Sequence, residues 1–116
     1  MSDYIKMIID GIRDTTAYLL GKEIEKEYLV YNGVESSGEL YALLMQMTAE
    51  GNICKAENLL FKELDDEFTV EKYLAGLDFY EYLNELGEAY LKGHNFSLLE
   101  VEQGLKDLEK YNVNRV

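Results

Sequence analysis

Four carboxylates recur along one predicted helix at a spacing that suits cation binding. They are Asp78, Glu81, Glu85 and Glu88. Intervals of three and four residues place them on one face of a helix with 3.6 residues per turn. Hard cations such as Ca²⁺ and Mg²⁺ prefer carboxylate oxygens. The opposite face is apolar, so the acidic face is expected to point into water, and a solvated face is the simpler interpretation of this pattern.

A catalytic centre would need further groups that the sequence does not bring together. His94, the only histidine, follows Gly93 in a predicted turn and has no second His or Cys at ligand spacing. Cys54, the only cysteine, lies in the first turns of a predicted helix without a partner base. We therefore expect an exposed or capping histidine, a semi-buried structural cysteine, no catalytic residue and no cofactor. An enzyme is the least favoured class of function.

Apolar periodicity predicts that helices position these residues. Apolar side chains recur at i, i+3, i+4 and i+7, the pattern of a helix with one buried stripe. The absence of Pro suits uninterrupted helices. We expect five or six helices and no sheet. Their predicted ranges are 3–20, 22–31 (or an extension of the first helix), 36–50, 52–64, 69–92 and 97–111.

Capping residues and glycine turns set the boundaries of these helices. Ser36-x-x-Glu39 and Ser97-x-x-Glu100 have the spacing of a capping box, and Asn52 is a predicted N-cap. Gly51 and Gly93 separate paired apolar helices, so each pair is expected to form an αα-hairpin. The fold class is all-α: a single domain over residues 1–116 in which antiparallel helical hairpins stack and an N-terminal helix packs across them.

The apolar stripes of these helices predict the core. Its expected members are Leu43, Leu44, Met47, Ala56, Leu60, Phe79, Leu83, Leu86, Tyr90, Val101, Leu105 and Leu108. On the N-terminal helix the main stripe holds Ile5, Ile8, Ile9 and Ile12, together with Leu19 and Leu20. A core of this size is expected for one domain of 116 residues.

The charge of the chain restricts its partners. The net charge is −12, from 23 acidic and 11 basic residues, and the field of such a molecule repels nucleic acids and anionic membranes. A basic peptide or protein is a compatible partner, although excess acid also simply keeps a protein in solution. A single cysteine suits a reducing cytoplasm. Charged residues interrupt the apolar N-terminus, so no signal peptide is expected, and no apolar run approaches the roughly 20 residues of a membrane span.

One part of the chain resembles a known helical repeat. The run Leu86-Gly87-Glu88-Ala89-Tyr90, with Gly93 beyond it, resembles the first helix of a tetratricopeptide repeat. Gly51 followed by Ala56 is similar to the turn and the small crossing residue of that repeat. Positions 51 and 93 are 42 residues apart instead of 34, the terminal Pro is missing, and leucines occupy the second crossing position at residues 98–99. The resemblance implies tetratricopeptide-like hairpins and not a regular array.

Short segments over nearly the whole chain carry a second resemblance. They are Asp3-Tyr4-Ile5, Met7-Ile8, Ala56-Glu57-Asn58-Leu59-Leu60-Phe61, Leu77-Asp78-Phe79-Tyr80, Leu83-Asn84, Asn95-Phe96-Ser97 and Gly104-Leu105. These segments are similar to an uncharacterised family of small bacterial helical proteins, a domain of unknown function. The resemblance implies a soluble all-α fold and supplies neither an activity nor site residues.

Two classes of function remain after these exclusions. The first is a non-catalytic cytoplasmic protein-interaction module or partner subunit, because stacked helical hairpins present grooves that take extended or helical peptides. Its partner would be an unknown protein or peptide, for which a basic charge is compatible. The alternative is a metal- or small-ligand-binding protein that uses the acidic helix face.

A second apolar stripe on the N-terminal helix predicts self-association. It holds Tyr4, Met7, Gly11 and Tyr18. A helix that is apolar on two sides is usually buried between neighbours or lies at a subunit contact. Gly11 permits close approach of another helix, and a self-complementary patch most often forms a two-fold dimer. In the other arrangement open to this chain, residues 22–31 fold back over the stripe.

Overall fold

The computed structural model describes residues 2–14 and 38–113, and these residues form helices joined by turns. The N-terminal helix spans residues 3–14. The other helices are α2 (Gly38–Ala49), α3 (Ile53–Asp66), α4 (Val70–Leu86), α5 (Glu88–Lys92) and α6 (Leu98–Val113). No strand occurs among the described residues. The predictions for residues 15–37, which include Tyr18, the helix at 22–31 and the Ser36 cap, lie outside the described part of the chain.

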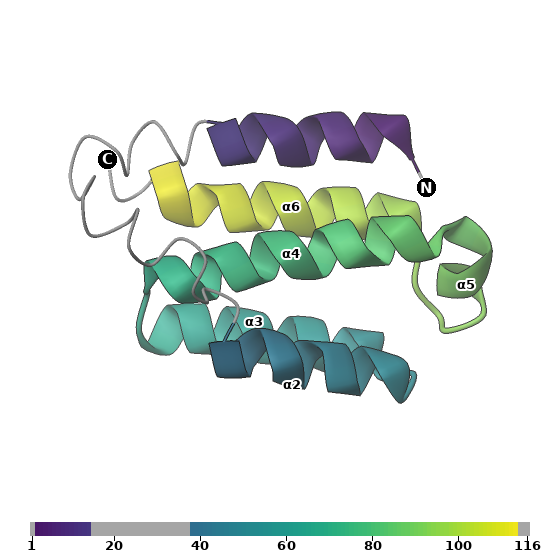
Figure 1. Ribbon diagram of the computed structural model, residues 1–116, viewed down its shortest axis with the longest axis horizontal. Coiled ribbons are helices and arrows are strands. Elements are labelled where there is room, and N and C mark those ends of the chain that lie inside the picture. Colours follow the sequence, from purple (N-terminus) through teal and green to yellow (C-terminus); the bar gives the residue numbers. More distant parts are fainter. Residues whose placement is uncertain (1, 15–37, 114–116) are drawn as a thin grey trace.

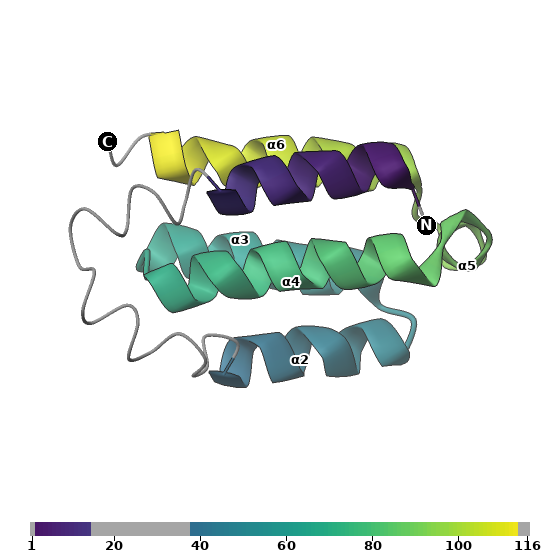
Figure 2. The same cartoon turned by 45° about the horizontal axis from the view of Figure 1, so that its top comes forward.

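Helix α4 is the centre of the fold. It packs against α2 and α3 on one side and against α6 on the other. Neighbouring helices along the chain run in opposite directions, so α2 and α3 form one antiparallel hairpin, and α4 and α6 are also antiparallel (Figure 1). The N-terminal helix runs alongside α6 and in the same direction (Figures 1 and 2). The all-α class, with helices packed against one another, is confirmed, whereas the tetratricopeptide-like stacking stays a prediction.

The core follows the predicted stripes with one clear error. Eight of the twelve predicted residues are buried: Leu44, Ala56, Leu60, Phe79, Leu83, Val101, Leu105 and Leu108. Three others, Met47, Leu86 and Tyr90, pack at its margin. The prediction for Leu43 is wrong, because this side chain is 43% exposed. Leu44 and Thr48 occupy the inner face of α2, and Leu43 points about 100° away from Leu44 on a helix.

Gly87 ends α4, so the prediction of one helix over residues 69–92 is wrong. The φ of Gly87 is 90° and its ψ is 164°, a conformation that residues with a Cβ seldom adopt. The short helix α5 follows and turns away at the end of the bundle (Figure 1). After α5 the chain turns back toward α6, and a hydrogen bond from the amide of Phe96 to the carbonyl of Leu91 closes this turn. The second hairpin therefore contains an extra helical turn instead of a simple glycine turn.

Two glycines, Gly76 and Gly104, allow α6 to approach α4. The helices therefore cross at a different place from residues 98–99, where the sequence predicts the crossing. A Cβ at Gly76 would lie 3.1 Å from a methyl group of Leu108. A Cβ at Gly104 would overlap the hydroxyl oxygen of Tyr80. Leu99, by contrast, is exposed. The small residues of this crossing are thus in the middle of α4 and α6, where the ring of Tyr80 needs the space.

The helix starts predicted at Asn52, Thr69 and Ser97 are confirmed, because each of these residues directly precedes a helix, but the hydrogen bonds that they make differ. The Ser97 hydroxyl accepts the Glu100 amide at 3.1 Å and donates to the Glu100 carboxylate at 3.2 Å, so Ser97 caps α6. Thr69 caps α4 by accepting the Lys72 amide. Asn52 is the N-cap residue of α3, yet its side chain makes no capping hydrogen bond. The boundary at Asn52 therefore depends on the Gly51 turn, where φ is 85°.

Candidate functional site

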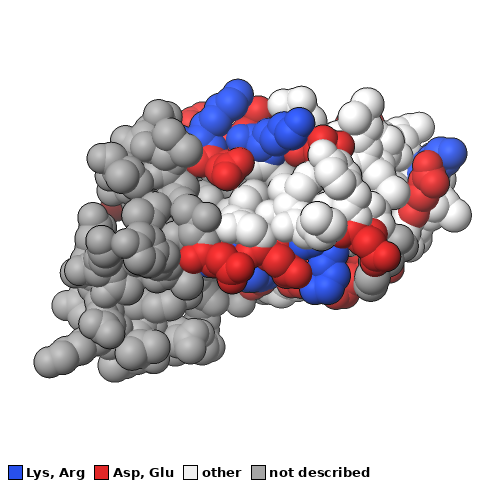
Figure 3. Space-filling model, turned by 90° about the horizontal axis from the view of Figure 1, so that it is seen from above, with Lys and Arg blue, Asp and Glu red and all other residues white. Residues whose placement is uncertain are grey.

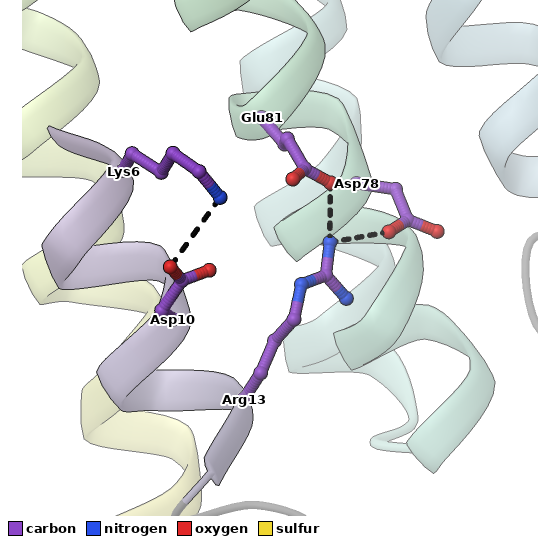
Figure 4. Close-up of polar contacts among 5 residues, drawn as sticks. All are labelled: Lys6, Asp10, Arg13, Asp78 and Glu81. Atoms are coloured by element: carbon purple, nitrogen blue, oxygen red, sulfur yellow. Dashed lines mark hydrogen bonds and ion pairs between the residues drawn. The ribbon is translucent and has the colours of Figure 1, made fainter. Parts of the chain in front are cut away.

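The acidic face of α4 holds an arginine of the same chain. Arg13 lies at the end of the N-terminal helix, and its Nη2 atom is 2.7 Å from Asp78 Oδ1 and 2.7 Å from Glu81 Oε1 (Figure 4). We call these three residues the Arg13 cluster. Burial alone would lower the pKa of Arg13, but the hydrogen bonds and charges of the two carboxylates outweigh it and raise the pKa above its ordinary value. The cluster joins the N-terminal helix to α4.

The four predicted cation ligands do not meet at one place. Glu85 is exposed on α4, and Glu88 lies beyond the break at Gly87, where it pairs with Lys92 at 3.5 Å. The prediction that all four share one helix face is therefore wrong for Glu88. Within residues 2–14 and 38–113, no group of three or more His, Cys, Asp or Glu side chains is arranged to hold a metal ion.

A buried asparagine fixes the other end of the N-terminal helix. Asn84 is 2% exposed, and its Oδ1 accepts the Ser2 amide at 2.8 Å while its Nδ2 donates to the Ser2 carbonyl at 3.1 Å. Between Asn84 and the Arg13 cluster, the buried side chains of Ile5, Ile9 and Ile12 complete the contact. Asparagine is unfavourable inside a helix, and this bond to a neighbouring helix end explains its presence.

A groove between α3 and α6 contains a second acidic cluster. It consists of two adjoining hollows of about 280 and 350 Å³ that share Phe61 and Asp107 as wall residues. We call it the acidic groove. The charged residues that line it are four carboxylates and one lysine: Glu57 and Asp65 from α3, and Glu100, Asp107 and Lys110 from α6. Lys110 pairs with only one of these carboxylates, Asp107, whereas in the Arg13 cluster one guanidinium pairs with both carboxylates.

Tyr80 contacts Glu57 and Gly104, two residues that line the acidic groove. This side chain is completely buried, and its hydroxyl passes Gly104 and donates to Glu57 Oε2 at 2.5 Å. Burial raises the pKa of Glu57 above its ordinary value; the bond from Tyr80 opposes this shift, and the charges of Glu100 and Asp107 add to it. Glu57 is therefore a carboxylate held in place in surroundings that disfavour its negative charge.

The other end of the groove is aromatic. The ring centroids of Phe61 and Tyr111 lie 5.9 Å apart with the planes inclined by 30°. The Tyr111 hydroxyl donates to Asp65 Oδ1 at 2.5 Å, and burial together with this bond raises the pKa of Tyr111 to about 12. Asp107 Oδ1 accepts Gln103 Nε2 at 3.2 Å and Lys110 Nζ at 3.3 Å. Among the described residues, the second oxygens of Asp65 and Asp107 accept no hydrogen bond.

His94 and Cys54 take no part in either acidic cluster. His94 stacks on Tyr90 with ring centroids 4.2 Å apart, and its Nδ1 lies 2.9 Å from the Tyr90 carbonyl oxygen. It therefore bonds a backbone carbonyl at the end of α5 and packs beside Gly51 of the α2–α3 turn. Cys54 is exposed, so the prediction of a semi-buried cysteine is wrong.

The described residues of the predicted dimer contact lie on one outer face. Tyr4 is 57% exposed and Met7 is 70% exposed, and Gly11 is also exposed. The Tyr4 hydroxyl donates to Glu102 of α6 at 3.3 Å. Figure 3 shows an uncharged surface on this side of the molecule, between rows of charged side chains. Tyr18 lies outside the described residues, and the dimer stays a prediction.

Sequence reasoning missed the acidic groove because its walls are distant in the chain. Glu57 belongs to α3 and Glu100 to α6. They lie near each other because both helices pack against α4. The pairing of Arg13 with α4 was also not predicted, although an arginine next to an apolar stripe indicates that an acidic partner lies nearby. The tyrosine count gave a weaker signal, since ten tyrosines are many for this length and buried hydroxyls need partners.

Three comparisons with known proteins and a membrane criterion complete the description of the site. No helix of the described residues combines the length and the apolar character needed to cross a bilayer. Comparison with curated proteins and with solved structures gave no match. A family model described as "Family of unknown function (DUF6483)" matches residues 1–112, a range that includes both acidic clusters. The chain therefore belongs to this family of unknown function.

Proposed function

We propose that this protein is a non-catalytic cytoplasmic interaction module that binds a basic segment of a partner protein in the acidic groove. The observation that carries the proposal is the charge of the groove, which among the described residues is lined by four carboxylates and one lysine. Like charges that are held close together repel, and a cationic ligand relieves this repulsion. The groove is thus complementary to a basic partner.

The shape of the groove supports the same proposal. Two helices form its walls, and its two hollows, of about 280 and 350 Å³, follow one another along α3 and α6. A groove between helices is a common site for an extended or helical peptide, whose side chains enter successive hollows. Two basic side chains on one segment would each find carboxylates: Glu57 and Glu100 in the first hollow, and Asp65 and Asp107 in the second.

The alternative function, a cation or small ligand on the acidic face of α4, has less support. Arg13 already occupies Asp78 and Glu81 at 2.7 Å, so a ligand at this place would have to displace a guanidinium that also holds the N-terminal helix. A calcium titration followed by calorimetry tests it. Saturable heat that is lost in Glu81→Gln would favour the alternative.

Amide chemical shifts of the full chain, titrated with a short peptide of alternating Arg, Lys and Ala, test the proposal. We expect the largest shifts along α3 and α6, and none with a peptide in which Glu replaces both basic residues. Asp107→Asn should weaken binding about two- to fivefold, the range of a partly exposed ion pair. The matched control is Asp10→Asn, which removes an exposed acid of the N-terminal helix that pairs with Lys6.

Two results would contradict this function. The first is the absence of saturable shifts at low ionic strength, where charge interactions are least screened. The second is an equal loss of affinity in Asp107→Asn and Asp10→Asn, because attraction by net charge alone does not distinguish the groove from the rest of the surface.

A further inference from the structure

The geometry of the aromatic end of the groove points to a more specific ligand. We propose that Phe61, Tyr111, Asp65 and Asp107 form a pocket for one arginine side chain of the partner and distinguish it from lysine. This inference rests on the proposed function, since it names the side chain that the acidic groove recognises. Two features carry it: an aromatic wall, and two carboxylates that each have one oxygen without a partner among the described residues.

The aromatic wall favours a planar cation. The ring centroids of Phe61 and Tyr111 lie 5.9 Å apart with the planes inclined by 30°, and both residues line this hollow. A guanidinium is flat and weakly hydrated and stacks on aromatic rings, whereas an ammonium is compact and strongly hydrated. A wall of this kind therefore attracts both cations but suits the guanidinium better.

The carboxylates add a directional requirement. Tyr111 holds Asp65 Oδ1, and Gln103 and Lys110 hold Asp107 Oδ1, so both side chains are fixed through one oxygen. Within residues 2–14 and 38–113, no donor bonds their Oδ2 atoms, and a partner could supply one. A guanidinium carries five N–H donors in a fixed plane and can bond two acceptors while it stacks. An ammonium must give up hydration for each such bond.

The chain itself shows how each cation behaves beside its acids. Arg13 lies 2.7 Å from both Asp78 and Glu81, and its side chain is only 33% exposed. Lys110 lies 3.3 Å from Asp107, and its side chain is 72% exposed at the edge of the groove. The arginine enters between two carboxylates, while the lysine stays in water. The hollow at the aromatic end is likewise lined by two carboxylates, Asp65 and Asp107, and the cation that lines it among the described residues is the exposed Lys110.

Calorimetric titration of the full chain with three peptides tests the inference. The peptides share a basic sequence and differ at one central position, which is Arg, Lys or citrulline, the uncharged analogue of arginine. We expect the Arg peptide to bind about three- to tenfold more tightly than the Lys peptide, and the citrulline peptide to bind most weakly. Tyr111→Leu should abolish the preference for Arg over Lys, and Tyr111→Phe, which keeps the ring, should retain it.

The outcomes separate this inference from the proposed function. Equal binding of the Arg and Lys peptides to the native chain, with both weakened by Asp107→Asn, would overturn the arginine pocket and leave the basic-segment function intact. Binding of neither peptide would overturn both. Tyr4→Leu is the control for loss of an exposed ring elsewhere and should leave the ratio of the two affinities unchanged. If Tyr111→Leu does not fold, the Arg-to-Lys ratio of the native chain and of Tyr111→Phe still decides the question.

Discussion

The Arg13 cluster and the acidic groove are two groups of carboxylates on one small molecule, and they differ in where their cation comes from. In the first, Asp78 and Glu81 share the guanidinium of Arg13, which the N-terminal helix brings to α4. In the second, Glu57, Asp65, Glu100 and Asp107 line a groove with one exposed lysine at its edge. The first cluster joins two parts of the fold, while the second leaves negative charge at an open surface.

This difference has a consequence for stability. Repulsion among the groove carboxylates and the partial burial of Glu57 both disfavour the folded chain. Proteins commonly retain such unfavourable groups where a ligand needs them. Changes in the Arg13 cluster should therefore weaken the fold, and changes that remove charge from the acidic groove should strengthen it while they reduce binding.

The largest expected effect on stability comes from a buried leucine of α3, the helix that forms one wall of the groove. Leu60 of α3 is completely buried, so Leu60→Ala should lower the free energy of unfolding by roughly 2–5 kcal/mol. Leu86→Ala should cost less, since Leu86 packs at the margin of the core. Urea denaturation measures both, with Leu43→Ala as the exposed control at under about 0.5 kcal/mol. A cost below about 1 kcal/mol at Leu60 would show that the helix faces are assigned incorrectly.

An added methyl group at Gly104, which lines the groove, should destabilise the fold. In Gly104→Ala the new Cβ would meet the Tyr80 hydroxyl, so we expect a loss of about 1–3 kcal/mol. Gly11 is the matched control, because a Cβ there meets no atom of the described residues within 4 Å. Gly11→Ala should stabilise the N-terminal helix by up to about 1 kcal/mol. Thermal denaturation of both variants provides the comparison, and equal shifts in Tm would contradict it.

The Arg13 cluster should make a moderate contribution to stability. Arg13→Met keeps much of the apolar side chain and removes both ion pairs, and we expect a loss of about 1 kcal/mol because the partners are only partly shielded from solvent. Lys6→Met, which breaks the exposed pair with Asp10, is the control and should change little. Urea denaturation would refute a structural role for Arg13 if the two variants were equally stable.

Glu57 should give a small effect of the opposite sign. Its pKa is higher in the folded chain than the ordinary value of 4.5, so the folded state binds this proton more tightly than the unfolded state. Its contribution to stability is present below the ordinary pKa and is lost as the pH rises through the raised value. Glu57→Gln, which keeps an acceptor for Tyr80, should therefore be more stable than the native chain at neutral pH.

The difference in unfolding free energy between Glu57→Gln and the native chain, measured from acid to neutral pH, checks this sign. It should grow as the pH rises, and the same variant should bind the basic peptide more weakly. A difference that does not vary with pH, or that shrinks toward neutral pH, would contradict the assignment of Glu57 as a disfavoured charge in the groove.

Local patterns in the sequence predict much of the fold, and the groove shows where such reasoning stops. The cap at Ser97 and the buried stripe of α3 follow from short-range spacing, and both are present. The break at Gly87 was missed because one glycine inside a helical pattern is usually tolerated. The contact of Tyr80 with Gly104 and Glu57 joins three helices, and only tertiary packing determines it.

The central claim is that the acidic groove accepts a cation from a partner, and Lys110 gives the most direct test. Lys110→Gln removes the one cation that lines the groove among the described residues. Lys106→Gln removes a cation of α6 that pairs with Glu102, a residue that does not line the groove. Both variants change the net charge equally. Calorimetric titration with the basic peptide should show about two- to fivefold tighter binding in Lys110→Gln than in Lys106→Gln. Equal affinities, or weaker binding in Lys110→Gln, would contradict the account.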